Sequence, residues 1–280
     1  MAERPERRAP RARGAQVLRT ERITPHMVRV VLGGDGLADF ALDGYTDHYV
    51  KLCFAPEGAE YAHPFDMARI REEYPRELWP TTRTYTVRSW DAAARELAID
   101  FVVHGDEGLA GPWAAGAKPG DQVTFLGPGG GYAPEASADW HLLAGDESAL
   151  PAVAAALERM PAGAVVHAFV EVADAAEEQK IATPDGVAVT WLHRAGRPVG
   201  EALVEAVTGL EFPPGDVQAF VHGEAGFVKE IRRHLRLERG IPADRLSISG
   251  YWRLGHDDEA WRSVKREWNE QVQREQERAA

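Results

Sequence analysis

The sequence predicts two domains, an antiparallel β-barrel in the first half and an α/β domain with a parallel sheet in the second. Short strand patterns separated by glycine and proline turns fill the first half, whereas apolar strands alternate with helical patterns in the second. The chain has 280 residues, of which 44% are hydrophobic and 27% charged, so it can form two cores of ordinary size.

Six segments of the first half carry strand patterns, and the first two are rich in valine and are separated by a turn at Thr24 and Pro25. We predict strands at residues 15–23, 27–32, 49–54, 83–89, 96–103 and 122–126. The interval 55–82 is poor in strand pattern and contains four prolines. A loop of this length is usually functional or mobile.

The second half begins near residue 140, where the sequence period changes. We predict strands at 141–145, 165–172, 187–192, 217–221 and 246–251, and helices at 148–160, 200–207 and 226–239. A last helix at 258–278 carries Trp261, Val264, Trp268 and Val272 on one stripe, which we expect to pack against the second domain. The predicted domains are residues 15–133 and 140–280, joined by a stretch that contains Pro134, Ala136 and Ser137.

Bulk properties exclude several classes of protein. The net charge of −12 argues against a nucleic-acid-binding protein. Cys53 is the one cysteine, so the chain carries no intramolecular disulfide and no iron–sulfur cluster with several cysteine ligands, and we expect a half-buried, inert thiol. We expect no metal site. We also expect no membrane partner, because no segment is apolar and long enough to span a bilayer.

The N-terminal residues 1–14 are basic. Two adjacent arginines resemble a twin-arginine export signal, but no apolar segment follows them. We therefore predict a disordered tail and a cytoplasmic protein. The arginines of this tail are Arg4, Arg7, Arg8, Arg11 and Arg13.

The segment Arg-Thr-Tyr-Thr-Val-Arg at 83–88 is the strongest local signal. On a strand, Arg83, Tyr85 and Val87 share one face, and the intervening Thr84, Thr86 and Arg88 share the other. A flavin requires a cation for its pyrophosphate, a flat partner for its ring and a hydrogen-bonding group near N5. The alternative is an edge strand with solvated arginines.

Six segments in order resemble the siderophore-interacting proteins, a branch of the ferredoxin–NADP reductase superfamily. They are 49–52 (Tyr-Val-Lys-Leu), 83–88, 100–105 (Asp-Phe-Val-Val-His-Gly), 144–151 (Ala-Gly-Asp-Glu-Ser-Ala-Leu-Pro), 222–225 (His-Gly-Glu-Ala) and 249–255 (Ser-Gly-Tyr-Trp-Arg-Leu-Gly). The resemblance covers residues 16–261. It implies an FAD-binding barrel followed by an NAD(P)H-binding α/β domain.

In the barrel, the resemblance implies that Arg83 binds the FAD pyrophosphate, Tyr85 packs on the isoalloxazine and Thr86 faces N5. Thr84 and Val87 belong to the same motif, and His104 would contact the phosphate or adenine end. The helix start at 108–114 departs from the family, because Leu109 and Gly111 stand where proline and serine are common. Its backbone N–H groups can still bind a phosphate, and the positions we expect to contact FAD there are Gly108, Ala110, Gly111 and Trp113.

In the second domain, Asp146, Glu147 and Ser148 join the first strand to its helix, where doubly wound folds bind nucleotides. The resemblance places NAD(P)H there, and His222 and Glu224 are expected to line the same cleft. Arg194, with the neighbouring His193 and Arg197, is a candidate ligand of the adenosine 2′-phosphate, because a guanidinium donates two parallel hydrogen bonds to phosphate. A solvated basic turn is the alternative. The glycine-rich stretch 127–131 lacks the residues of a Walker loop and is predicted to be a turn.

The implied reaction is hydride transfer from NADPH or NADH to FAD, followed by electron transfer to iron(III) held by a siderophore. A reduced ferredoxin is an alternative donor. We expect Lys51, Arg253 and Lys265 to bind the anionic chelate, although a lysine on an amphipathic helix is commonly just solvated. No catalytic residue beyond the flavin is expected, and we expect the protein to act as a monomer. The rival functions are another FAD- and NAD(P)H-dependent oxidoreductase of the superfamily and a redox-inactive siderophore-binding protein.

Overall fold

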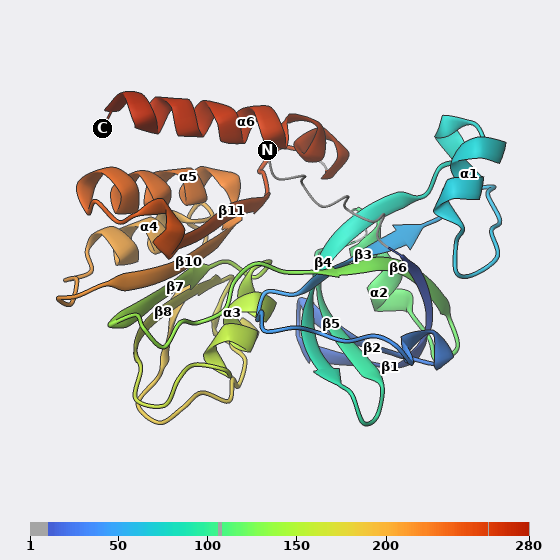
Figure 1. The fold of residues 1–280 in the computed structure, drawn as a ribbon, viewed down its shortest axis with the longest axis horizontal. Coiled ribbons are helices and arrows are strands. Elements are labelled where there is room, and N and C mark those ends of the chain that lie inside the picture. Colours follow the sequence, from blue (N-terminus) through green and yellow to red (C-terminus); the bar gives the residue numbers. More distant parts are fainter. Residues whose placement is uncertain (1–10, 106–107, 257, 280) are drawn as a thin grey trace, which may run out of the picture.

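The computed structural model describes residues 11–105, 108–256 and 258–279. A β-barrel and a parallel sheet covered by helices lie side by side, and the last helix extends along the top of the second domain (Figure 1). The predicted fold class is therefore confirmed. Within the described residues, no helix combines the length and the apolar character needed to cross a membrane.

The barrel is closed and antiparallel, with strand order β1-β2-β5-β4-β3-β6. Valine, leucine and isoleucine at alternate positions fill its interior, and Phe101 and Phe125 are almost completely buried among them. Its strands are β1 (Ala12–Thr24), β2 (Met27–Gly33), β3 (Tyr49–Phe54), β4 (Thr81–Asp91), β5 (Glu96–Val102) and β6 (Gln122–Gly129).

The predicted insertion between β3 and β4 contains helix α1 (Met67–Glu73) and a 3-10 turn η2 (Arg76–Leu78). Asp66 caps α1 by accepting hydrogen bonds from Ala68 N (3.1 Å) and Arg69 N (3.0 Å). The insertion packs on the barrel through a small apolar cluster that includes Cys53. Burial raises the pKa of the Cys53 thiol to about 11, as expected for an inert cysteine. Two further short helices of the barrel are η1 (Asp35–Leu37) and α2 (Ala110–Gly116).

The N-terminal prediction needs a correction, because β1 begins at Ala12, within the stretch predicted to be disordered. The backbone of Arg13 pairs with Phe125 of β6, and its guanidinium binds Asp39. Arg11 binds the same carboxylate at 2.5 Å. Asp39 thus gives these two arginines an anionic partner that the tail alone does not provide. Arg4, Arg7 and Arg8 lie outside the described residues.

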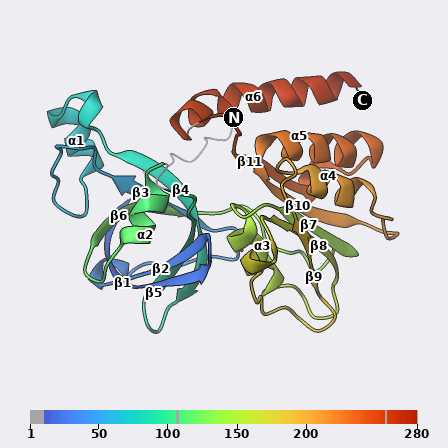
Figure 2. The same ribbon diagram turned by 180° about the vertical axis from the view of Figure 1, so that it is seen from behind.

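The second domain has a five-stranded sheet of order β11-β10-β7-β8-β9, in which every neighbouring pair is parallel. Helix α3 covers the face toward the barrel, and α4 and α5 cover the other face (Figure 2). The strands are β7 (Trp140–Gly145), β8 (Val165–Val172), β9 (Val189–His193), β10 (Val217–Glu224) and β11 (Leu246–Trp252). The helices are α3 (Leu150–Leu157), η3 (Ala175–Glu177), α4 (Glu201–Thr208), α5 (Ala225–Arg233), the π-helical η4 (His234–Glu238), η5 (Ala243–Arg245) and α6 (Asp258–Ala279).

Helix α6 packs as its apolar stripe predicts. Trp261 and Val272 are buried, and the rings of Trp261 and Trp268 lie 5.4 Å apart. Lys229 of α5 binds Glu275 of α6 at 2.7 Å, which attaches the far part of the helix to the second domain. The first turns of α6 also reach the barrel, because Arg262 donates to the carbonyl oxygen of Thr82 at 2.7 Å.

Polar contacts join the two domains on the α3 side. Arg88 of β4 forms a bidentate pair with Glu158 at the end of α3, with distances of 2.8 and 2.6 Å. Glu177 is buried and accepts hydrogen bonds from the Thr24 hydroxyl (2.5 Å) and the His26 backbone N–H (3.3 Å). These contacts fix the position of the barrel relative to the parallel sheet.

Candidate functional site

The predicted site residues lie on two parts of the molecule. One is the first half of β4 with the loop before α2, and the other is the edge of the parallel sheet at which β7, β8, β9 and β10 end. In doubly wound folds, the carboxyl ends of the strands form the ligand-binding edge.

The segment Arg83–Thr86 lies where β4 has a strand neighbour on one side. Its residues pair with β3, and Thr84 lies opposite Lys51. The pairing of β4 with β5 runs from Val87 to Asp91. On the side away from β3, the backbone groups of this segment are therefore available for contacts other than a strand ladder.

The side chains of the motif divide between the barrel interior and its surface. Val87 is buried in the barrel core, and Tyr85 packs against that core, with its ring 4.3 Å from the ring of Phe101. The Phe101 ring lies 5.6 Å from that of Trp113 in α2. Thr84 is exposed and Thr86 is buried. Tyr85 and the predicted contact Trp113 thus both pack against Phe101.

Arg83 binds a carboxylate from the far end of the chain. Its guanidinium forms a bidentate pair with Glu259 in the first turn of α6, and the Nη2–Oε2 distance is 2.7 Å. Arg262, on the same helix, donates to the Thr82 hydroxyl at 2.9 Å. Sequence analysis missed Glu259 and Arg262, because they belong to a helix whose pattern indicated packing only.

The loop before α2 contains the other predicted FAD contacts. His104 is exposed, Gly108 has a φ of +81°, and Ala110 is buried at the helix start. A Cβ at Gly111 would lie 3.1 Å from the carbonyl oxygen of Val102, so glycine allows a close approach of the loop to β5. This contact gives a physical reason for the departure from the serine of the family.

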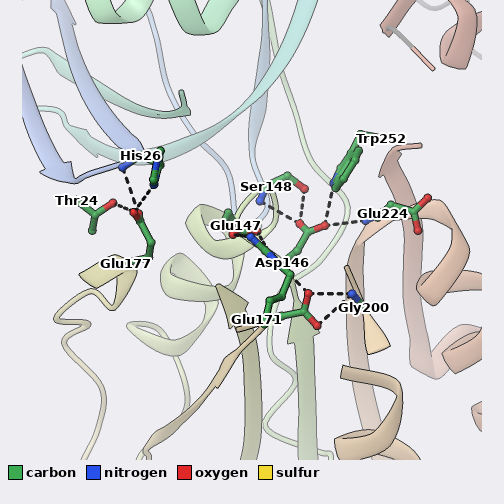
Figure 3. A network of polar contacts seen from close by, with 11 residues as sticks. Thr24, His26, Asp146, Glu147, Ser148, Glu171, Glu177, Gly200, Glu224 and Trp252 are labelled. Atoms are coloured by element: carbon green, nitrogen blue, oxygen red, sulfur yellow. Dashed lines mark hydrogen bonds and ion pairs between the residues drawn. The ribbon is translucent and has the colours of Figure 1, made fainter. Parts of the chain in front are cut away.

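At the sheet edge, Asp146 is fully buried and joins three strand ends (Figure 3). It accepts hydrogen bonds from the Ser148 hydroxyl (2.6 Å), the Glu224 backbone N–H (2.8 Å) and the Trp252 indole (2.8 Å). Burial raises its pKa to about 6, although these donors oppose that shift. Asp146 therefore positions β7, β10 and β11 relative to one another.

Glu224 has a similar structural role. Its carboxylate accepts hydrogen bonds from Gly226 N (2.5 Å) and Phe227 N (3.3 Å) at the start of α5, and from Leu254 N (3.2 Å) after β11. The segment from Trp252 to Leu254, which leads into α6, is consequently held by two buried carboxylates. The predicted nucleotide contacts Asp146 and Glu224 lie at the expected edge, with their oxygens bound to protein donors.

His222 is buried on β10 between two aromatic rings. Its ring lies 4.0 Å from that of Phe220 and 4.9 Å from that of Tyr251. Its Nε2 is 3.0 Å from the Ser247 hydroxyl, and its Nδ1 has no hydrogen-bond partner within the described residues. Burial, with a smaller effect of the Lys265 charge, lowers the pKa of His222 to about 3, so the ring is neutral at pH 7.

The basic residues after β9 are all paired with carboxylates. Arg194 forms a bidentate pair with Glu147 and also lies 3.4 Å from Glu171. His193 Nε2 is 2.8 Å from Glu178. The remaining one, Arg197, binds two carboxylates of α4, those of Glu201 at 2.8 Å and Glu205 at 2.6 Å.

The predicted substrate contacts lie on both domains. Lys51 is half-buried on β3, next to Thr84. The guanidinium carbon of Arg253 lies 5.9 Å from the ring centre of Trp261. Lys265 is half-buried on α6, and its charge contributes to the lowered pKa of His222. Arg253 thus lies between β11 and α6, Lys265 on α6 and Lys51 on the barrel.

Two protein-family models match the chain in order. The model described as siderophore-interacting FAD-binding domain matches residues 16–132, and the model described as siderophore-interacting protein matches residues 138–255.

Characterised and solved relatives span nearly the whole chain. The ferric vibriobactin reductase of Vibrio cholerae is 36% identical over 87% of this chain and 90% of its own length. An NADPH-dependent ferric-chelate reductase of Escherichia coli is 35% identical over 86% of this chain and 93% of its own length. The crystal structure of a siderophore utilization protein from T. fusca superposes with a TM-score of 0.76 at 43% identity, over 89% of this chain and 95% of that one.

Proposed function

Because the chain belongs to the siderophore-interacting protein family, we propose that it is a ferric-siderophore reductase that uses FAD and NAD(P)H. The observation that carries the proposal is the position of Arg83 on β4, where the strand pairs with β3 alone and the guanidinium holds an exposed carboxylate. Glu259 keeps 55% of its side-chain surface exposed, so an anionic ligand can displace it from Arg83. The names of the relatives from Vibrio cholerae and Escherichia coli support a ferric chelate as the electron acceptor.

The residues around Arg83 fit FAD. The guanidinium already holds a carboxylate, and it would hold the pyrophosphate in the same bidentate manner. Tyr85 and Trp113 offer aromatic faces for the ring system, and Thr84 and Thr86 offer hydroxyls on the same strand. The backbone of Gly108, Ala110 and Gly111, together with His104, completes the set of candidate FAD contacts.

When bound, FAD supplies the chemistry, since a flavin accepts two electrons as a hydride and releases them singly. The protein holds donor and acceptor close and in order. Asp146 and Glu224 fix the strand ends against which NAD(P)H is to bind, and Ser148 is fixed by its bond to Asp146. The neutral His222 adds no charge to this region.

The chelate is proposed to bind between the barrel and α6. Ferric siderophores are often anionic, whereas the protein has a net charge of −12, so local cations have to attract them. Lys51, Arg253 and Lys265 are the cations that we assign to this role. Reduction to iron(II) weakens the chelate, because hard oxygen donors bind the more highly charged ion more strongly.

We further propose that the reaction takes place in the cytoplasm, where reduced nicotinamide nucleotides are available. A monomer suffices for it, because β4 and the sheet edge belong to one chain and are fixed to each other by pairs such as Arg88–Glu158. Nucleic acid and membrane have no part in it.

The absorbance spectrum of the purified protein tests the proposal. We expect flavin bands that bleach with NADH or NADPH in the absence of oxygen and return when a ferric siderophore is added. A colourless protein that takes up no added FAD would overturn the proposal and favour a siderophore-binding protein. Bleaching without reoxidation by any ferric chelate would favour a reductase with a different acceptor.

A further inference from the structure

The sheet edge that follows β8 and β9 is rich in carboxylates. Five of them face the three basic groups that sequence analysis assigned to a phosphate: Glu147, Glu171, Glu178, Glu201 and Glu205. Five carboxylates face at most three positive charges, so the formal charge of this edge is negative at pH 7. An incoming phosphate dianion would therefore meet like charges.

Arg194 binds carboxylates that lie at the ends of β7 and β8. Both of its terminal nitrogens bind Glu147, and the Nη1–Oε2 distance is 2.8 Å. A 2′-phosphate would need the same two nitrogens, because bidentate binding uses the same fork of donors. It would therefore have to displace Glu147 and then lie beside the displaced carboxylate.

Glu171 and Glu147 differ in what they can offer to a ligand. Glu171 is completely buried and caps α4, with its oxygens 2.8 and 3.1 Å from the Gly200 backbone N–H. The side chains of Glu147 and Arg194 keep 16% and 17% of their surface exposed. Of the two carboxylates that bind Arg194, Glu147 is therefore the one that the adenosine ribose of a nucleotide can reach.

We propose that this edge selects NADH over NADPH and that Glu147 is the residue that determines the selectivity. The inference rests on the proposed function, because it concerns the nucleotide that reduces the flavin. A carboxylate accepts a hydrogen bond from a ribose 2′-hydroxyl and repels a 2′-phosphate, which is how doubly wound domains distinguish the two nucleotides. The relative from Escherichia coli is named NADPH-dependent, so membership of the family does not fix this choice.

Binding of the oxidised nucleotides tests the inference, because they do not reduce the flavin. Isothermal titration calorimetry of the full-length, FAD-loaded protein with NAD⁺ and NADP⁺ gives a ratio of dissociation constants. We expect the wild type to bind NAD⁺ about tenfold or more tightly than NADP⁺, and Glu147→Gln to shift the ratio about tenfold toward NADP⁺, since Arg194 is then released to bind phosphate.

Glu205→Gln is the matched control, because it removes the same charge from another arginine pair of the same edge. We expect it to change the ratio less than threefold, about the effect of a solvated surface charge. Tighter binding of NADP⁺ than of NAD⁺ by the wild type would overturn the inference but not the proposed function. Equal ratios of the two dissociation constants in the wild type and Glu147→Gln would do the same. A flavoprotein that binds neither nucleotide and is bleached by neither NADH nor NADPH would overturn the proposed function, and the inference with it.

Discussion

Arg83 and His222 show at the residue scale how one side chain can be bound by distant parts of the fold. Arg83 lies on β4 and is bound by a helix 176 residues further on. His222 lies on β10 and is enclosed by two rings and a serine hydroxyl. Each has a measurable consequence, the first for FAD binding and the second for stability.

We expect Arg83→Gln to weaken FAD binding about 10- to 100-fold, because hydrogen bonds to charged groups contribute about 1.5–3 kcal/mol. Fluorescence titration of the flavin-free protein with FAD measures the effect. Arg19→Gln is a suitable control, because Arg19 also forms a bidentate pair with a glutamate, Glu96, on the surface of the barrel. Equal FAD affinity in the wild type and Arg83→Gln would exclude Arg83 as the pyrophosphate ligand.

Acid should destabilise the protein through His222. Its pKa falls from the ordinary 6.5 to about 3 in the folded state, so the unfolded chain takes up a proton first as the pH decreases. The stability that this group provides is complete above pH 6.5 and is lost progressively toward pH 3, by up to about 1.4 kcal/mol per pH unit. Urea unfolding at pH 7 and pH 5 measures the loss, and the loss should be smaller in His222→Phe, which keeps the aromatic packing. An identical loss in both proteins would assign the acid sensitivity to other groups.

Helix α6 is the element that links the two halves of the proposed site. It packs on α5 and β11, and its first turn carries Glu259 and Arg262 to β4. Glu259 occupies the guanidinium that we assign to the FAD pyrophosphate. Loading of FAD and the position of the first turn of α6 should therefore be coupled.

We expect Glu259→Gln to strengthen FAD binding about three- to tenfold, because it removes the anion that competes for Arg83. The same fluorescence titration applies, and Glu267→Gln, an exposed glutamate of the same helix, is the control. Weaker FAD binding by Glu259→Gln would mean that Glu259 supports the site instead of competing with its ligand.

At the scale of the whole molecule, the position of the barrel relative to the sheet decides whether a bound nicotinamide and a bound flavin can come into contact. The Arg88–Glu158 pair fixes that position. The hydrogen bonds that Glu177 accepts from Thr24 and His26 do so as well (Figure 3). Their loss would leave each domain folded but less well positioned.

We expect Glu158→Gln to lower the rate of flavin reduction by NAD(P)H about tenfold while leaving the FAD affinity unchanged, because misplaced reactants lose orientation rather than binding. Anaerobic stopped-flow measurement at the flavin band separates the rate from the affinity. Glu96→Gln, which breaks an arginine pair within the barrel, should leave both unchanged. An unaltered reduction rate in Glu158→Gln would show that the pair does not control the domain arrangement.

Local patterns in the sequence were sufficient to predict the fold class and most of its elements, but not helix α1 in the insertion. Alternation separated Val87 from Thr84, which the structure buries and exposes respectively, and the stripe of α6 predicted the burial of Trp261. Strand alternation and helix period depend on neighbours within a few residues, so a single sequence contains them. The start of β1 was missed, because the strand is stabilised by Asp39 and by β6, which lie far along the chain.

The sequence by itself determined the fold class and the family, and it located the segments that we propose to bind FAD and the nucleotide. The tertiary structure alone decided which polar groups meet: Glu259 on Arg83, Glu147 on Arg194, and Trp252 on Asp146. The reason is physical. Periodicity reports burial along one element, whereas an ion pair depends on the distance between two elements, and that distance is set only when the whole chain has folded.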